Sequence, residues 1–156
     1  KKLEANWYLE WENVIYQPGE LLAIGYRSGE EVLSHKIKTT QEAYKIILEA
    51  YKKELTTDDS ETGIINAFVV DEDGNIVPNA DQLLHFKVEG VGRFLGCGNG
   101  NPGSHEPDTQ PRRRAFNGMC QLLVKPVGKE GKIHVEVTAN GLLAGKITLN
   151  VGRKLV

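Results

Sequence analysis

The chain has 156 residues, of which 40% are hydrophobic and 26% charged, and its formal net charge at pH 7 is -2. This composition is typical of a globular protein with one domain of ordinary size and some chain left over. The small negative charge argues against a nucleic-acid partner, which favours basic surfaces, and no hydrophobic run approaches the roughly 18 residues of a membrane-spanning helix.

The N-terminal part predicts three short strands. The sequence begins with neither an initiator Met nor a signal-like segment, so we expect a processed product or a piece excised from a longer chain. Candidate strands follow at 7–16, 20–26 and 31–38, and glycine-containing turns separate them. Three strands are too few for a sandwich. We interpret residues 1–40 as the closing strands of a preceding β domain.

Aromatic residues gather in the same N-terminal part, and Trp7 and Trp11 are the largest of them. Exposed rings of this kind could form a platform on which a sugar stacks. The alternative is packing inside a core or a domain interface, which is the more common role of aromatic residues at the end of a domain. We favour packing and keep both tryptophans as candidate aromatic contacts.

Residues 39–55 allow two interpretations. Thr39 or Thr40 could cap a helix whose apolar residues recur at helical spacing, whereas 44–50 alternates between apolar and polar residues like a strand. Local propensity favours the helix. Tertiary context overrides propensity, and the surrounding sequence predicts β structure throughout. We therefore predict a strand at 44–50.

The remainder of the chain predicts a β-sandwich over residues 41–156. Apolar and polar residues alternate at 84–88, 133–139 and 147–151, as expected for half-buried antiparallel strands. The segment 64–70 is apolar on both faces and predicts a central strand. Frequent turn signals between these segments, including an Asp-Gly pair at 73–74, favour two facing antiparallel sheets.

A long loop is expected between two strands, over residues Gly96–Gly118, and such loops inside compact domains are commonly functional. The glycines at 98, 100 and 103 match the pattern of a dinucleotide-binding turn, but no helix follows, so we reject a nucleotide site. We expect these glycines to supply positive φ angles.

The loop also supplies the candidate binding residues. Its polar side chains could contact a glycan or another domain, and the run Arg112–Arg114 could bind an anion, although a solvated or salt-bridged run is the simpler interpretation. The candidate residues for glycan or interface contact are Asn99, Asn101, Ser104, His105, Glu106 and Arg113.

No catalytic or metal site is expected. Glu106 and Asp108 share one flexible segment, whereas paired catalytic carboxylates face each other across a cleft. His35, His85 and His134 lie on predicted solvent-facing strand positions, and no histidine pairs with another His or Cys at metal-ligand spacing. The acidic turn at 71–75 lacks the further oxygen ligands of a calcium loop. We predict no cofactor.

The two cysteines, Cys97 and Cys120, are too few for a disulfide framework. They flank the long loop, so a single bridge is conceivable, but a free cysteine is commonly a small buried apolar residue. We favour free thiols.

Several motifs in order resemble one family. The stretch 71–80 reads DEDGNIVPNA, and 86–96 reads FKVEGVGRFLG; Asn99-Gly100-Asn101-Pro102, Ser104-His105-Glu106 and Arg114–Gly118 follow. This order resembles the C-terminal immunoglobulin-like module of bacterial β-galactosidases in glycoside hydrolase family 2. The upstream residues resemble the closing strands of the β domain that precedes that module. Cys97 and Cys120 depart from the small residues usual at those positions.

The resemblance implies an all-β fold, an immunoglobulin-like antiparallel β-sandwich preceded by the terminal strands of another β domain. The catalytic glutamates of the family lie in an upstream (β/α)₈ barrel, for which this chain has no room. It is therefore expected to be a non-catalytic accessory module that packs against other domains of a parent hydrolase. The alternative is a carbohydrate-binding module that contacts glycan through the 98–118 loop or the N-terminal aromatics. The family also implies a periplasmic or secreted bacterial location.

Overall fold

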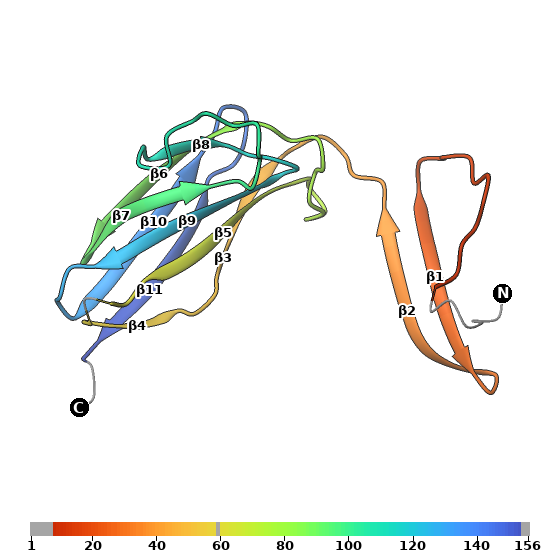
Figure 1. The fold of residues 1–156 in the computed structure, drawn as a ribbon, viewed down its shortest axis with the longest axis horizontal. Helices are drawn as coiled ribbons and strands as arrows, with labels where there is room; N and C mark the ends of the chain where they lie inside the picture. The colour runs from red at the N-terminus through yellow and green to blue at the C-terminus, as the bar shows by residue number, and fades with distance from the viewer. Residues whose placement is uncertain (1–7, 59, 154–156) are drawn as a thin grey trace. The chain divides into compact units, whose positions relative to one another are not determined.

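The computed structural model describes residues 8–58 and 60–153. The chain divides into two compact units, Lys1–Thr39 and Thr40–Val156. All regular structure in the described ranges is β-strand, from β1 to β11 (Figure 1). None of the described residues forms a helix that could cross a membrane.

The first unit contains one β-hairpin. Strand β1 (Glu20–Arg27) pairs antiparallel with β2 (Glu30–Lys38). The two residues between them, Ser28 and Gly29, have φ angles of 55° and 89°. Two successive positive φ angles are those of a type I′ turn, whose twist matches the twist of paired strands. The turn therefore fixes the register of the hairpin.

The strand predicted at 7–16 is wrong for the residues that the structure describes. Tyr8 to Tyr16 form bends and turns, and Asn13 has a φ angle of 58°, which breaks an extended backbone. Trp7 lies outside the described residues. The other two predicted strands of this unit are confirmed as β1 and β2.

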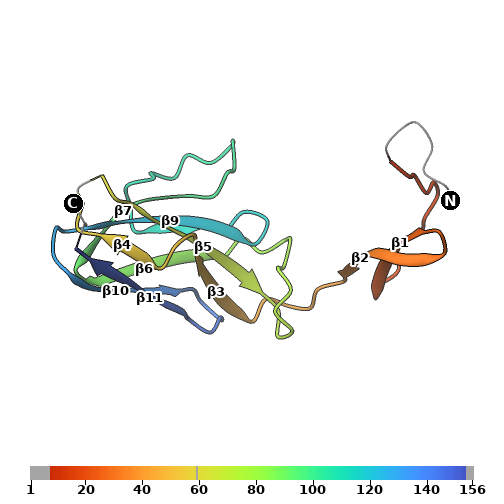
Figure 2. The ribbon, with the colours of Figure 1, turned by 90° about the horizontal axis from the view of Figure 1, so that it is seen from below.

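The second unit is a sandwich of two sheets, seen as two layers in Figure 2. The five-stranded sheet has the order β4-β11-β10-β6-β8, and the four-stranded sheet has the order β3-β5-β9-β7. Neighbouring strands are antiparallel except β11 and β4, which are parallel. The bounds are β3 (Lys45–Ala50), β4 (Glu54–Thr56), β5 (Gly63–Val70), β6 (Leu83–Gly90), β7 (Gly92–Gly98), β8 (Arg112–Arg114), β9 (Met119–Pro126), β10 (Gly131–Thr138) and β11 (Gly145–Gly152).

The sandwich confirms the predicted all-β fold and the strand at 44–50, which is β3. The segment forms a strand despite its helix-like spacing, because β3 pairs along its whole length with β5 and this pairing overrides local propensity. The predicted central strand at 64–70 is β5, which lies between β3 and β9.

The core lies between the two sheets and is formed by the alternate residues of each strand. Leu84 from β6, Ile133 from β10, and Ile65 and Leu122 from the facing sheet are each 0% exposed. Every residue of this buried cluster falls between positions 46 and 151, so the second unit has a hydrophobic core of its own. A closed core of this kind lets a domain fold independently.

The acidic turn at 71–75 is a structural element. The Asp71 carboxylate is 0% exposed and accepts hydrogen bonds from the backbone N–H of Asn75 at 2.8 Å and of Gln41 at 3.1 Å. Burial alone would raise the pKa of Asp71, but these hydrogen bonds together hold it below its ordinary value. The turn thereby ties the end of β5 to the start of the unit.

The outer faces of the two sheets differ in character. On the five-stranded sheet the outward residues are charged and paired, as in Lys146–Glu136 at 2.8 Å and Lys87–Glu89 at 3.0 Å. On the four-stranded sheet the outward pairs of β5 with β9 are neutral, namely Ile64 with Leu123, Asn66 with Gln121, and Phe68 with Met119. Charged residues flank them on the same face, with Glu49 opposite Asn66 and Arg93 opposite Lys125. The uncharged part of this face is therefore the strip along β5 and β9.

Candidate functional site

The loop between β7 and β9 is shorter than the predicted loop over residues 96–118, because part of it forms a strand. Arg112–Arg114 form strand β8, which pairs with β6 in the opposite sheet. The irregular part is 99–111, and the chain then crosses from one sheet to the other. The correction has a physical cause: β6 would otherwise leave its backbone groups at this edge without partners, and three residues in extended conformation supply them.

Arg113 is the centre of this loop. Its neighbours Arg112 and Arg114 are exposed, as a solvated run predicts, but Arg113 is 5% exposed and points inward. Its Nη1 donates to the Glu106 carbonyl oxygen at 2.7 Å and to Asp108 Oδ1 at 2.5 Å. Charge-assisted hydrogen bonds are the stronger ones in proteins. The buried guanidinium therefore anchors the loop to the sandwich.

Three of the predicted site residues shape the loop through bonds to its backbone. Asn99 Oδ1 accepts from the N–H of Asn101 at 3.0 Å, and Asn101 Oδ1 accepts from the N–H of Gly103 at 2.9 Å. Ser104 Oγ accepts from the N–H of Glu106 at 3.4 Å. Asn and Ser side chains stabilise turns in this way. The side-chain oxygens of these residues are thus used inside the loop.

The remaining two loop candidates differ in exposure. Glu106 is half-buried, and its Oε2 accepts from the backbone N–H of Arg114 at 3.2 Å. His105 is exposed and makes no hydrogen bond or ion pair within the described ranges. The structure brings Asn99, Glu106 and Arg113 together and leaves His105 apart from them.

The thiols of Cys97 and Cys120 are free and buried, as expected. Cys97 Sγ lies 3.4 Å from the Gln110 carbonyl oxygen, and Cys120 Sγ lies 3.2 Å from that of Gly98. Burial raises the pKa of Cys97 to about 11 and that of Cys120 to about 12. Both thiols are therefore protonated near neutral pH and act as small buried groups that fasten the loop ends.

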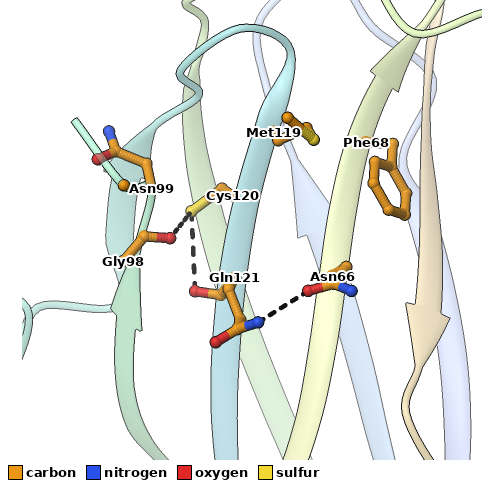
Figure 3. Close-up of a pocket in the computed structure, with 8 residues that line it drawn as sticks. Asn66, Phe68, Gly98, Asn99, Met119, Cys120 and Gln121 are labelled. Carbon is orange, nitrogen blue, oxygen red and sulfur yellow. Dashed lines mark hydrogen bonds between the residues drawn. The ribbon is translucent and has the colours of Figure 1, made fainter. Parts of the chain in front are cut away.

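A hollow of about 420 Å³ lies on the outer face of the four-stranded sheet, where β7 runs into the loop. Figure 3 shows Asn66 on β5 and Gln121 on β9 side by side, with Gln121 Nε2 donating to Asn66 Oδ1 at 3.0 Å. The residues that line the hollow are Asn66, Phe68, Gly98, Asn99, Gly100, Met119, Cys120 and Gln121.

Sequence reasoning found only the loop side of this hollow. Asn66 stands within the apolar run of β5, and a polar residue in such a run is the one signal that could have indicated it. Its partner Gln121 and the neighbouring Phe68 and Met119 come together through strand pairing that no local pattern reveals.

The remaining candidate residues, an aromatic side chain and three histidines, lie on the surface. Trp11 is 57% exposed, so its ring is not part of a core within the described residues. His35, His85 and His134 are exposed on their strands, as predicted. Among residues 8–58 and 60–153, no group of three or more His, Cys, Asp or Glu side chains could hold a metal ion.

Comparison with known proteins agrees with this architecture. Residues 46–148 match the model of the glycoside hydrolase family 2 C-terminal domain 5, and residues 1–33 match a domain of unknown function, DUF4982. The chain is 35% identical over 137 residues to the β-galactosidase BoGH2A of Bacteroides ovatus, a match that covers 88% of this chain and 16% of that protein.

Two crystal structures show the same fold. A glycosyl hydrolase family 2 member from Bacteroides cellulosilyticus and a β-glycosidase from Bacteroides vulgatus each superpose with a TM-score of 0.84 at 30% identity. Each match covers 88% of this chain and 18% of the other. The sandwich, its motifs and these matches together show that the chain belongs to the glycoside hydrolase family 2 C-terminal domain 5 family.

Proposed function

We propose that this chain is a non-catalytic accessory module of a family 2 glycoside hydrolase that acts on β-galactosides. Its relatives are glycosidases of which it spans less than a fifth, and their names supply the substrate class. The module packs against other domains of the parent enzyme and stabilises it. The catalytic groups belong to the remainder of the parent.

The observation that carries this proposal is the exposure of large apolar side chains on the hairpin. Leu21, Leu33 and Ile37 share one face in the β1–β2 register and are 64%, 69% and 58% exposed. A two-stranded hairpin is at best marginally stable in water by itself. Large apolar side chains gathered on one face mark a surface that another part of a protein covers.

The energy available from covering this face is substantial. Burying one large aliphatic side chain contributes about 1.5–3 kcal/mol, so three of them contribute enough to matter against a typical domain stability of about 5–15 kcal/mol. The hairpin thus completes a β layer of the parent and joins the sandwich to it through the chain.

The test uses the full-length parent polypeptide with Leu21 and Leu33 both replaced by lysine. We expect a lower unfolding temperature and a lower yield of folded enzyme, with unchanged turnover of a nitrophenyl β-galactoside per folded molecule. The control is Glu30→Lys, since Glu30 is exposed and lies opposite Arg27 beside the turn, away from the apolar residues. Equal unfolding temperatures for all three proteins would contradict the packing role.

The non-catalytic part of the proposal has a separate test. The purified chain of 156 residues is incubated with nitrophenyl glycosides, and we expect no release of nitrophenol. Reproducible hydrolysis that persists through repeated purification would refute it.

A further inference from the structure

The outer face of the four-stranded sheet beside the end of β7 is the part of the sandwich for which packing of the hairpin gives no explanation. Its hollow contains no charged side chain in its lining. Its polar lining side chains are amides, and its apolar ones are Phe68 and Met119, which pair across β5 and β9. Small-molecule sites commonly combine an apolar surface with a few orienting polar groups.

The amide pair leaves donors and an acceptor open to a ligand. The bond from Gln121 Nε2 to Asn66 Oδ1 fixes both side chains relative to each other. Within the described ranges, Asn66 Nδ2 and Gln121 Oε1 make no further hydrogen bond. A hydroxyl group both donates and accepts, so adjacent hydroxyls match such a pair.

The glycines at the rim keep the hollow open. A Cβ atom added to Gly98 or Gly100 would meet nothing within 4 Å, so space lies above both residues. Gly98 is the last residue of β7, directly opposite Gln121. A flat ligand can therefore approach the amides over the end of β7.

We propose that this hollow binds a neutral saccharide unit. The C–H face of a sugar ring packs on Phe68 and Met119, and its hydroxyls bond Asn66 Nδ2 and Gln121 Oε1. Aromatic side chains offer an apolar face of the size that a sugar ring presents. No charged side chain lines the hollow, and Glu49, which pairs with Asn66 on the same face, is acidic, so an anionic ligand would lose hydration here without gaining a counter-charge.

This inference goes beyond the proposed function, because the module can stabilise its parent whether or not the hollow binds sugar. It also differs from binding through the loop alone, because only Asn99 and Gly100 of the 99–111 loop line the hollow and the other lining residues lie on strands. With one ring and two side chains in contact, we expect a dissociation constant in the millimolar range.

The test is a titration of the ¹⁵N-labelled chain of 156 residues with galactose and with lactose, followed by NMR. We expect saturable shifts of the side-chain amide signals of Asn66 and Gln121. Glucuronate, which carries a charge, is expected to give at least about a tenfold weaker response, a difference equivalent to about 1.4 kcal/mol.

One variant blocks the hollow without removing a hydrogen bond from it, and a second variant is its control. Gly98→Leu places a side chain in the open space above Gln121, and we expect it to abolish the shifts. Gly152→Leu is the matched control, because a Cβ there also meets nothing within 4 Å and Gly152 lies at the end of β11, away from the hollow. This control should bind like the original chain.

Four results would overturn the proposal. The first is the absence of shifts at about 100 mM sugar, a concentration well above a millimolar dissociation constant. The second is undiminished binding by Gly98→Leu, and the third is a set of shifts confined to the 99–111 loop. Occupation of this face by another domain in the full-length enzyme, seen as protection of the Asn66 and Gln121 amides without sugar, would equally refute it. None of these results bears on the hairpin test above.

Discussion

The hairpin and the sandwich follow the same sequence rule and reach opposite outcomes. Leu21, Leu33, Leu84 and Leu122 each have one apolar and one polar neighbour along the strand, yet the first two are 64% and 69% exposed and the last two 0%. In the sandwich a second sheet faces the apolar row; within the described part of the hairpin unit, none does. Whether an apolar side chain of a strand is buried therefore depends on a second layer and cannot be read from its neighbours in the sequence.

The largest expected effect compares one truncation in each unit. Leu84→Ala should lower the free energy of unfolding by about 2–5 kcal/mol, since it leaves a cavity between two sheets. Leu21→Ala in the same 156-residue chain should change it by less than about 0.5 kcal/mol, as expected for an exposed position. Urea denaturation of both variants measures the difference. Equal losses would show that the hairpin has a covering layer within the chain.

The next effect separates backbone strain from steric conflict within the sandwich. Gly118 and Gly141 have φ angles of 74° and 76°, but a Cβ at Gly118 would lie 2.5 Å from the Val77 carbonyl oxygen and one at Gly141 would meet nothing. Gly141→Ala should cost about 1–2 kcal/mol for its left-handed backbone. Gly118→Ala should cost about 1–3 kcal/mol more, because the carbonyl must move. Thermal unfolding of the pair tests this, and similar midpoints would disprove the steric contribution.

A smaller effect concerns the loop that Arg113 supports. Arg113→Met removes its bonds to Glu106 and Asp108 and should destabilise the sandwich by about 1–3 kcal/mol. The amides of 99–111 should then exchange faster with solvent. Arg112→Met is the control, because Arg112 is exposed and a surface contact contributes about 0–1 kcal/mol. Unchanged exchange in the Arg113 variant would mean that the backbone alone orders the loop.

The smallest effect is a pH dependence that Asp71 confers on the sandwich. Its hydrogen bonds hold its pKa in the folded state below the value of about 3.9 in an unfolded chain. The unfolded state therefore takes up the proton first, so this stabilisation is complete above about pH 4 and is lost as the pH falls through the folded-state pKa. Urea midpoints measured from pH 6 to pH 2.5 should fall less with decreasing pH for Asp71→Asn than for the original chain. Glu72→Gln is the control and should show the same fall as the original chain. Parallel curves for Asp71→Asn and the original chain would exclude the role.

Hydrophobic periodicity and turn chemistry were enough to predict most of the fold. The alternation at 84–88, 133–139 and 147–151 and the apolar run at 64–70 all correspond to strands of the sandwich. These signals are local, since each strand encodes its own buried face. The strand predicted at 7–16 is wrong because its apolar residues gave a pattern without a pairing partner among the described strands.

By itself, the sequence determined the all-β class, the family and the buried faces of the strands, because periodicity, turn residues and motif order are written along the chain. Only the tertiary structure decided that Arg113 turns inward and that Asn66 and Gln121 meet beside Gly98. Those contacts join residues that are far apart in sequence, and strand pairing between distant segments is set by the packing of the whole sandwich. The hairpin shows the converse: its strands carry large apolar side chains, and two strands by themselves provide no second layer to bury them.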